Sequence, residues 1–294
     1  MGFLVGLDQL SLAATADGSF TFFSATFQEH FHSNFGAKQE AEQKFILPAL
    51  SPLPPSRPIC LIDFCYGLGY NTAAALEYLA PERQVCLIGL ENNLEVPQTA
   101  VRDRLISIWQ PPTQQILSQL AHHQTYQTEQ HDLQLLIGDA RQTIQQVPLA
   151  WADAIFFDPF SPKRCPQLWT IDLLSLVSDR LKPQGYLVTY SCAAAVRSAL
   201  HTLGLHFWAT QPLGRKAPGT IASWQNDAIP NRSQALSELE QEILTTRAGI
   251  PYRDPQLQDP AAVIVQRRQA EQATSKLRST SNWLKQHLSG KCDP

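Results

Sequence analysis

The stretch ICLIDFCYGLGYNTAAALEYLA, residues 59–80, decides the fold. Its apolar start, ICLI, is typical of a buried strand, and its end, TAAALEYLA, is typical of a helix. Between them, Gly67 and Gly69 allow the backbone to approach a ligand where a Cβ atom would clash. The loop is not G-x-G-x-x-G, because residue 72 is Thr, and it is not a P-loop, because no G-K-[ST] follows. We therefore predict a strand, glycine loop and helix that hold a ligand other than a dinucleotide or a nucleotide phosphate.

Beyond this unit, short apolar runs alternate with helical segments. Continuous apolar runs indicate strands covered on both faces, so a mostly parallel, Rossmann-like α/β sheet is predicted. The proline-rich segment SPLPPSRP, residues 51–58, separates this sheet from a predicted hairpin at residues 10–24. We predict three parts: an N-terminal hairpin and substrate loop (1–55), a main domain (56–225) and a helical C-terminal extension (226–294).

Composition limits the classes of function. The 294-residue chain is 44% hydrophobic and carries a net charge of −3, which argues against a generally basic nucleic-acid binder but permits a local basic face. No apolar run reaches about 18 residues, and the N-terminus has no basic leader, so neither a membrane span nor a signal peptide is expected. The six cysteines lack C-x-x-C spacing. They indicate free thiols and a cytoplasmic location rather than disulfides or a zinc site.

Four acidic residues follow the predicted strands in order. Asp63 ends the first apolar run and Glu91 the second, whereas Asp139 follows the third and Asp158 ends the fourth. Because ligands of such sheets bind beyond the carboxyl ends of the strands, we expect these carboxylates to share one rim. An acidic rim repels phosphates and suits a ligand with hydroxyl groups and positive charge. S-adenosylmethionine has a ribose diol, an ammonium and a sulfonium but no phosphate, and it is the predicted cofactor.

The fourth acid opens the motif DPFSPKRCPQLWT, residues 158–170. Pro159 disfavours helical geometry in the residue before it, so Asp158 is expected to be extended and to point into the rim crevice. Phe160 and Trp169 offer flat apolar surface for a planar substrate. A carboxylate beside a sulfonium can accept a hydrogen bond from a primary amine, orient its lone pair and stabilise developing positive charge. The motif predicts methyl transfer to nitrogen, with Asp158 as the catalytic residue.

Three segments together resemble a known family: DFCYGLGYNT (63–72), DAIFFDPFSPKRCPQLWT (153–170) and LGRK (213–216). They look like the methyltransferase half of the bifunctional enzymes that complete 5-methylaminomethyl-2-thiouridine at the wobble position of tRNA. The resemblance covers about residues 10 to 224. It implies a class I methyltransferase fold, with a mostly parallel seven-stranded sheet and a reversed last strand. It also implies S-adenosylmethionine as cofactor and the aminomethyl group on uridine 34 of tRNA as substrate. The FAD-dependent oxidase half of that family is not expected in this chain, because it has no second glycine fingerprint and too few residues.

The resemblance implies roles for individual residues, and two further residues are expected at the substrate because of their place in the sequence. The residues expected to bind the cofactor are Asp63, Tyr66, Gly67, Gly69, Asn71, Glu91, Asp139 and Asp158, with Glu91 at the ribose and Asp139 on the adenine side. Those expected to meet the substrate are His32, Glu40, Phe160, Lys163, Trp169, Arg215 and Lys216, the three basic ones at tRNA phosphate. His32 and Glu40 are included because they follow the hairpin. Tyr66, Pro159 and Cys165 depart from the family pattern, which usually has Phe, Gly and Asn at these places.

Several alternatives remain open. Glu29, His30 and His32 in EHFHS are candidates for a metal site, but a substrate loop or plain exposure fits them better, and no metal is predicted. The segment RRQAEQATSKLR, residues 267–278, is interpreted as a solvated helix face or a tRNA-facing helix. For the whole chain, the other candidates are methylation of another amine, a polyamine-synthase-like aminopropyl transferase, and a non-catalytic binding module on the same fold.

Overall fold

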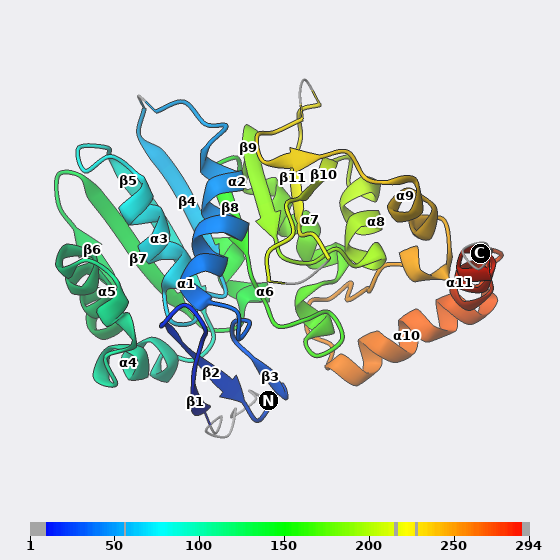
Figure 1. Cartoon of the computed structure of the whole chain (residues 1–294), viewed down its shortest axis with the longest axis horizontal. Helices are drawn as coiled ribbons and strands as arrows, with labels where there is room; N and C mark the ends of the chain where they lie inside the picture. Colours follow the sequence, from blue (N-terminus) through cyan, green and yellow to red (C-terminus); the bar gives the residue numbers. More distant parts are fainter. Residues whose placement is uncertain (1–9, 56, 215–216, 227–228, 290–294) are drawn as a thin grey trace.

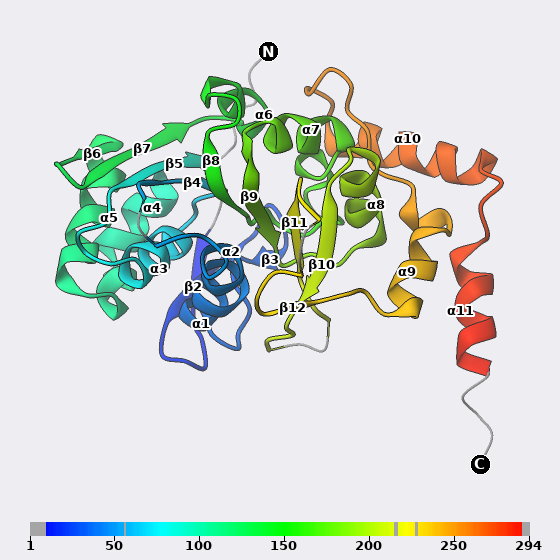
Figure 2. The ribbon, with the colours of Figure 1, turned by 90° about the horizontal axis from the view of Figure 1, so that it is seen from above.

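The computed structural model describes residues 10–55, 57–214, 217–226 and 229–289. Across these residues, a nine-stranded central sheet has the order β12-β10-β11-β9-β8-β4-β5-β7-β6 (Figures 1 and 2). Its strands are β4 (Ile59–Phe64), β5 (Val85–Glu91), β6 (Thr125–Gln127), β7 (His131–Ile137), β8 (Ala152–Phe157), β9 (Leu181–Thr189), β10 (His206–Thr210), β11 (Thr220–Ser223) and β12 (Ser233–Gln234).

The predicted seven-stranded sheet is confirmed as the centre of this larger sheet. Strands β7, β5, β4, β8 and β9 pair in parallel, whereas β11 runs antiparallel to both β9 and β10. The reversed last strand is therefore β11. Two short edge strands, β6 and β12, were not predicted, and they pair antiparallel with β7 and β10. The strand order reverses at β4, which lies between β5 and β8, and this switch point is where such sheets bind ligands.

Helices cover both faces of the sheet (Figure 2). They are α3 (Tyr70–Tyr78), α4 (Glu95–Arg102), α5 (Pro111–His123), α6 (Ala140–Thr143), α7 (Ile171–Asp179) and α8 (Ala194–Thr202), with short 3₁₀ turns η2 (Leu105–Ile108), η3 (Ile144–Gln146) and η4 (Pro166–Leu168). Successive side chains of a strand point to opposite faces, so Leu61 joins the core beneath α3 and α5 while Ile62 joins the core beneath α7 and α8. Burial on both faces explains why β4 is a continuous apolar run.

An N-terminal unit stands over the carboxyl ends of the central strands. It contains a small sheet of β1 (Leu10–Ala14), β2 (Phe20–Ser24) and β3 (Glu29–His30), and a helical segment of α1 (Ala37–Glu40), the π-helix η1 (Ala41–Ile46) and α2 (Leu47–Leu50). The predicted hairpin is the β1–β2 pair, in which Leu10 faces Ser24 and Ala14 faces Phe20. The helical segment packs on α3 through the buried side chains of Phe45 and Ile46.

The C-terminal extension consists of helices joined by arginine contacts. Its helical elements are α9 (Glu238–Leu244), η5 (Arg247–Gly249), α10 (Ala261–Thr274) and α11 (Thr280–Ser289), and they follow β12, with which the extension joins the sheet. Arg268 donates to the carbonyls of Ala248 and Ile250, and Arg267 donates to the carboxylate of Asp259. These two arginines of the basic segment are therefore engaged within the extension. In the described parts of the chain, no helix combines the length and apolar character needed to cross a membrane.

Candidate active site

The glycine loop between β4 and α3 has the backbone geometry that its sequence predicts. Gly67 and Gly69 have φ of 55° and 80°, in the left-handed region that favours glycine. A Cβ atom on Gly69 would lie 2.6 Å from the hydroxyl oxygen of Tyr66, so no larger residue fits there without movement. Gly69 is the N-cap of α3, and the loop thus delivers the backbone directly to the switch point of the sheet.

Asp63 and Tyr66 lie beneath this loop. Asp63 is fully buried and accepts hydrogen bonds from the backbone nitrogen and hydroxyl of Thr72, at 3.1 and 2.7 Å. Burial raises the pKa of Asp63 to about 7, against the effect of these hydrogen bonds. The ring of Tyr66 fills the space that Cβ atoms on Gly69 and Gly89 would occupy. Both residues were expected to bind the cofactor, and in this structure they shape the loop from below.

Glu91 ties the end of β5 to the glycine loop. One carboxylate oxygen accepts from the backbone nitrogen of Gly67 and the other from that of Asn93, both at 2.8 Å. Burial raises the pKa of Glu91, although both backbone hydrogen bonds oppose the shift. Its own carbonyl accepts from the backbone nitrogen of Gly138 at 2.8 Å, which brings the following Asp139 to the same rim. Asp139 caps α6 and is paired with Arg141.

Asp158 follows β8 immediately and lies beside the glycine loop. Its backbone nitrogen donates to the carbonyl of Phe64, and its carboxylate accepts from the side-chain amide of Asn71 at 3.2 Å. Its enclosed position, followed by the negative charge of Glu40, raises the pKa of Asp158 well above its ordinary value. The structure therefore brings Asn71, Glu91 and Asp158 together around the switch point.

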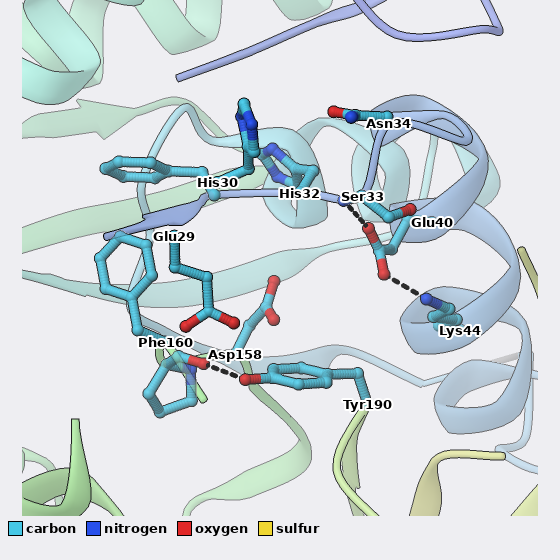
Figure 3. A pocket seen from close by; sticks show the side chains of 12 residues that line it. Glu29, His30, His32, Ser33, Asn34, Glu40, Lys44, Asp158, Phe160 and Tyr190 are labelled. Atoms are coloured by element: carbon cyan, nitrogen blue, oxygen red, sulfur yellow. Dashed lines mark hydrogen bonds and ion pairs between the residues drawn. The ribbon is translucent and has the colours of Figure 1, made fainter. Parts of the chain in front are cut away.

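A cavity of about 260 Å³ opens over Asp158 (Figure 3). Its walls come from the loop after β8, from Tyr190 directly after β9, and from the N-terminal unit. The lining residues are Glu29, His30, Phe31, His32, Ser33, Asn34, Glu40, Lys44, Asp158, Pro159, Phe160 and Tyr190. Of the residues expected at the substrate, His32, Glu40 and Phe160 line this cavity. Burial lowers the pKa of His32 to about 4, so its ring is neutral at physiological pH.

An aromatic cluster forms one wall of the cavity. The ring of Phe160 stacks on Phe27, with centroids 4.4 Å apart, and meets Phe31 edge-on at 4.9 Å. Beside it, one oxygen of Glu29 accepts from both the backbone nitrogen and the hydroxyl of Ser161, at 3.0 and 2.9 Å. Tyr190 donates to the carbonyl of Pro159 at 2.8 Å. The N-terminal unit and Tyr190, which directly follows β9, thus hold the loop that carries Asp158.

Glu40 and Lys44 form a buried ion pair on another wall of the cavity (Figure 3). The second oxygen of Glu40 accepts from the backbone nitrogen of Ser33 at 2.8 Å. Burial alone would raise the pKa of Glu40, but the charge of Lys44 and these hydrogen bonds hold it below its ordinary value. Glu40 is therefore ionised and paired. Lys44 was not among the residues predicted for the site. Its position four residues after Glu40 was the signal in the sequence that could have indicated this pair.

Two other residues expected at the substrate, Trp169 and Lys163, lie outside the cavity lining. Trp169 is fully buried and donates its indole nitrogen to the carbonyl of Phe160 at 2.7 Å, so it supports Phe160 from below instead of offering a surface to substrate. Lys163 is exposed on the same loop. Arg215 and Lys216 lie outside the described residues. Among the residues that are described, no cluster of three or more His, Cys, Asp or Glu side chains is arranged to hold a metal ion.

The strand order, the glycine loop at the switch point and the carboxylates on the rim define a class I S-adenosylmethionine-dependent methyltransferase. Sequence comparison agrees, because a family described as S-adenosyl-L-methionine-dependent methyltransferase matches residues 103–225. The crystal structure of MnmC2 from Aquifex aeolicus is 33% identical, covers 91% of this chain and 86% of that chain, and gives a TM-score of 0.80. The chain belongs to the MnmC-like family of S-adenosylmethionine-dependent methyltransferases.

Other relatives show how far this likeness extends. An uncharacterized protein of Methanocaldococcus jannaschii is 29% identical over 95% of this chain and 77% of its own length. The tRNA 5-methylaminomethyl-2-thiouridine biosynthesis bifunctional protein MnmC of Ralstonia nicotianae is 25% identical over 78% of this chain, but the match spans only 37% of that protein. Spermidine synthase from Thermotoga maritima, at 12% identity and a TM-score of 0.50 over 72% of this chain and 67% of that one, shares the fold alone.

Proposed function

We propose that this methyltransferase acts on the aminomethyl group of a modified wobble uridine (U34) in tRNA, giving 5-methylaminomethyl-uridine or its 2-thio form. The observation that carries the proposal is the position of Asp158. Its carboxylate faces the cavity, directly beside the glycine loop that the cofactor would occupy. The bifunctional relatives are named for the synthesis of this nucleoside, and the match to one of them spans 78% of this chain and 37% of that protein.

The donor groups on the rim suit S-adenosylmethionine. Gly67 and Gly69 hold the loop in left-handed backbone at the switch point, and Glu91 and Asp139 offer acceptors for hydroxyl and amino groups. Among the described residues, no lysine or arginine lines the cavity except Lys44, which is paired. When bound, S-adenosylmethionine supplies an electrophilic methyl group on a sulfonium. We expect Gly67, Gly69, Asn71, Glu91, Asp139 and Asp158 to hold it, with Asp63 and Tyr66 supporting the loop.

The cavity carries an excess of negative charge that favours a cationic substrate. Glu29, Glu40 and Asp158 line it, and Lys44 neutralises one of them. A primary amine has a pKa near about 10, so it arrives as an ammonium ion and is attracted to these carboxylates. It must lose a proton before its lone pair can attack a methyl group. Asp158, whose pKa is raised, is suited to accept that proton and then to hold the neutral amine in line.

The aromatic wall suits a pyrimidine base. Phe160 and Phe31 line the cavity, and Phe27 stacks behind Phe160 to fix its plane. A planar base can stack on such a wall, which is a common way of holding an extruded nucleotide. Lys163 and Arg164 are exposed three and four residues after Phe160, where they can meet backbone phosphate despite the net charge of −3. A tRNA substrate also agrees with the predicted cytoplasmic location.

Nucleoside analysis tests the proposal. tRNA from cells that lack this enzyme would be incubated with the protein and S-adenosylmethionine, digested, and analysed by mass spectrometry. The proposal predicts loss of the 5-aminomethyl nucleoside and gain of its N-methyl product. If methyl groups appear on another nucleoside, or on no tRNA nucleoside at all, the substrate assignment is wrong while the methyltransferase class stands.

Aminopropyl transfer is a second candidate, because the spermidine synthase fold and the acidic cavity are compatible with a polyamine. That reaction uses decarboxylated S-adenosylmethionine. A larger rise in melting temperature with the decarboxylated compound than with S-adenosylmethionine would favour it, and the reverse order favours methyl transfer.

A further inference from the structure

The segment at residues 252–259, here called the strap, joins the C-terminal extension to the carboxyl rim of the sheet. The carbonyl of Tyr252 accepts from the backbone nitrogen of Ile171, and the backbone nitrogen of Asp254 donates to the carboxylate of Asp172, at 2.9 and 2.6 Å. Both contacts are with the first turn of α7. Figure 2 shows the same loop, in orange, passing beside α7 before α10 begins. The extension is therefore attached at the carboxyl rim of the sheet, where we expect the cofactor to bind.

Asp254 meets the rim through Arg141. Its side chain is fully buried, and one oxygen accepts from the guanidinium of Arg141 at 3.0 Å. The other oxygen accepts from the backbone nitrogens of Gln258 and Asp259, at 3.2 Å each, so the strap is folded around this carboxylate. The carbonyl of Asp259 accepts from the same guanidinium nitrogen at 3.0 Å. Arg141 is thus held from the strap side by two acceptors.

The same guanidinium holds Asp139 in a bidentate pair. Its Nη2 lies 2.7 Å and its Nε 3.1 Å from Oδ2 of Asp139, and only 11% of the Arg141 side chain is exposed. The Asp139 side chain is 40% exposed, and its loop leaves β7 through Gly138, whose φ is 142°. Oδ1 of Asp139 also accepts from the backbone nitrogen of Arg141 at 2.9 Å, and the guanidinium adds the contacts to Oδ2. The planar fork of arginine fixes both its direction and that of the loop.

We propose that the C-terminal extension is part of the cofactor site, and that Arg141 and Asp254 are positioning residues that fix Asp139 for the adenosyl group. The inference rests on the proposed place of Asp139 in that site and is independent of which amine is methylated. It gives the extension a role outside the region that the methyltransferase family matches, which ends at residue 225. Asp254 lies 113 residues from Arg141 in the sequence, and this one arginine links the extension to Asp139.

Substitution of Asp254 by Asn tests the inference on the full-length protein. The amide oxygen can still accept from Gln258 and Asp259, but the pair with Arg141 is lost. We expect S-adenosylhomocysteine to bind about tenfold more weakly by calorimetry, and the KM for S-adenosylmethionine to rise similarly, with kcat changed by less than about twofold. Glu271→Gln is the matched control, because it removes an acid of the extension that pairs with Arg253 and does not contact Arg141. It should bind as the wild type does.

The outcomes separate this inference from the proposed function. If Asp254→Asn folds and binds S-adenosylhomocysteine as tightly as the wild type, the extension is only a structural support and the inference fails. If Asp254→Asn does not fold, Arg141→Gln cuts the same link from the other side and must show the same loss of affinity. Loss of binding in these variants supports the inference even if no tRNA product is found, whereas a wild type that binds no S-adenosylhomocysteine overturns both.

Discussion

The side-chain amide of Asn71 donates a hydrogen bond to Oδ2 of Asp158 across 3.2 Å, although 87 residues separate the two. Asn71 belongs to the first turn of α3, immediately after the glycine loop, and Asp158 belongs to the loop after β8. The bond joins the part of the rim that would hold the cofactor to the part that would meet the amine. The reaction that we propose depends on this junction, because the acceptor nitrogen and the methyl donor must meet there.

Removal of the Asp158 carboxylate should abolish transfer and spare cofactor binding. We expect Asp158→Ala to lower kcat by about 10²- to 10⁴-fold, the usual contribution of a positioned acid or base. Binding of S-adenosylhomocysteine should change by less than about threefold, because Gly67, Glu91 and Asn71 remain. Single-turnover methyl transfer and calorimetry measure the two effects. The control is Asp132→Ala, at the N-terminal end of β7 and away from the rim, which should behave as the wild type. Near-normal turnover of Asp158→Ala would remove Asp158 from the mechanism.

Loss of Asn71 should move the pH dependence of the reaction. Its hydrogen bond stabilises the ionised form of Asp158 and so opposes the raised pKa. In Asn71→Ala the pKa of Asp158 rises further, so the carboxylate becomes available as a base only at higher pH. We therefore expect the acid limb of the pH–kcat profile to move to higher pH, with a several-fold loss of rate at neutral pH. An unchanged limb would mean that the titration of another group controls the profile.

Asp63 should make the free energy of unfolding fall as pH rises. Its pKa is raised by burial to about 7 in the folded protein, above its value of 3.8 in the unfolded chain, so the folded state binds the proton more tightly. This stabilising contribution is complete below about pH 4 and is lost as pH rises towards 7. Asp63→Asn removes the titration, so its stability relative to the wild type should increase between pH 4 and 7 by roughly 2–4 kcal/mol. Chemical denaturation at each pH measures the difference, and a constant offset would show that Asp63 does not titrate in this range.

Basic residues near the cavity should contribute to tRNA binding through phosphate. Replacement of Lys163 and Arg164 by Ala should weaken tRNA binding and reduce the slope of log Kd against log salt by roughly one for each phosphate that the variant no longer binds. The same result is predicted for the pair Arg215 and Lys216. Filter binding at several salt concentrations provides the measurement, and Arg102→Ala on α4 is the control. Equal affinity of wild type and variant at low salt would exclude the substituted pair from the interface.

Local sequence signals predicted the parts of the fold that local physics determines. The run ICLI, the two glycines and the helix after them were readable because burial, left-handed backbone and helical pattern each leave a mark within a few residues. The acids on the rim followed from the rule that parallel strands end at one edge, and the contact of Asn71 with Asp158 agrees with it.

Other parts of the site could not be predicted, because their partners lie far away in the sequence. Glu29 reaches Ser161 from β3, a two-residue strand with no periodic pattern, across 132 residues. Trp169 belongs to the same motif as Phe160, but its side chain is buried in the core. There it packs edge-on against Phe157 and Tyr190, and these contacts are not visible in the local sequence. The pair of Arg141 and Asp254 has no local signal in either segment.

The most direct test of the central claim is a reaction with defined tRNA. tRNA that carries 5-aminomethyl-2-thiouridine at the wobble position would be incubated with S-adenosylmethionine and either wild-type protein or Asp158→Ala, and the digested nucleosides would be separated and weighed by mass spectrometry. We predict that the wild type converts this nucleoside to 5-methylaminomethyl-2-thiouridine and that the variant does not. An unchanged wobble nucleoside with a wild-type protein that binds S-adenosylhomocysteine, or equal conversion by the variant, would contradict the account.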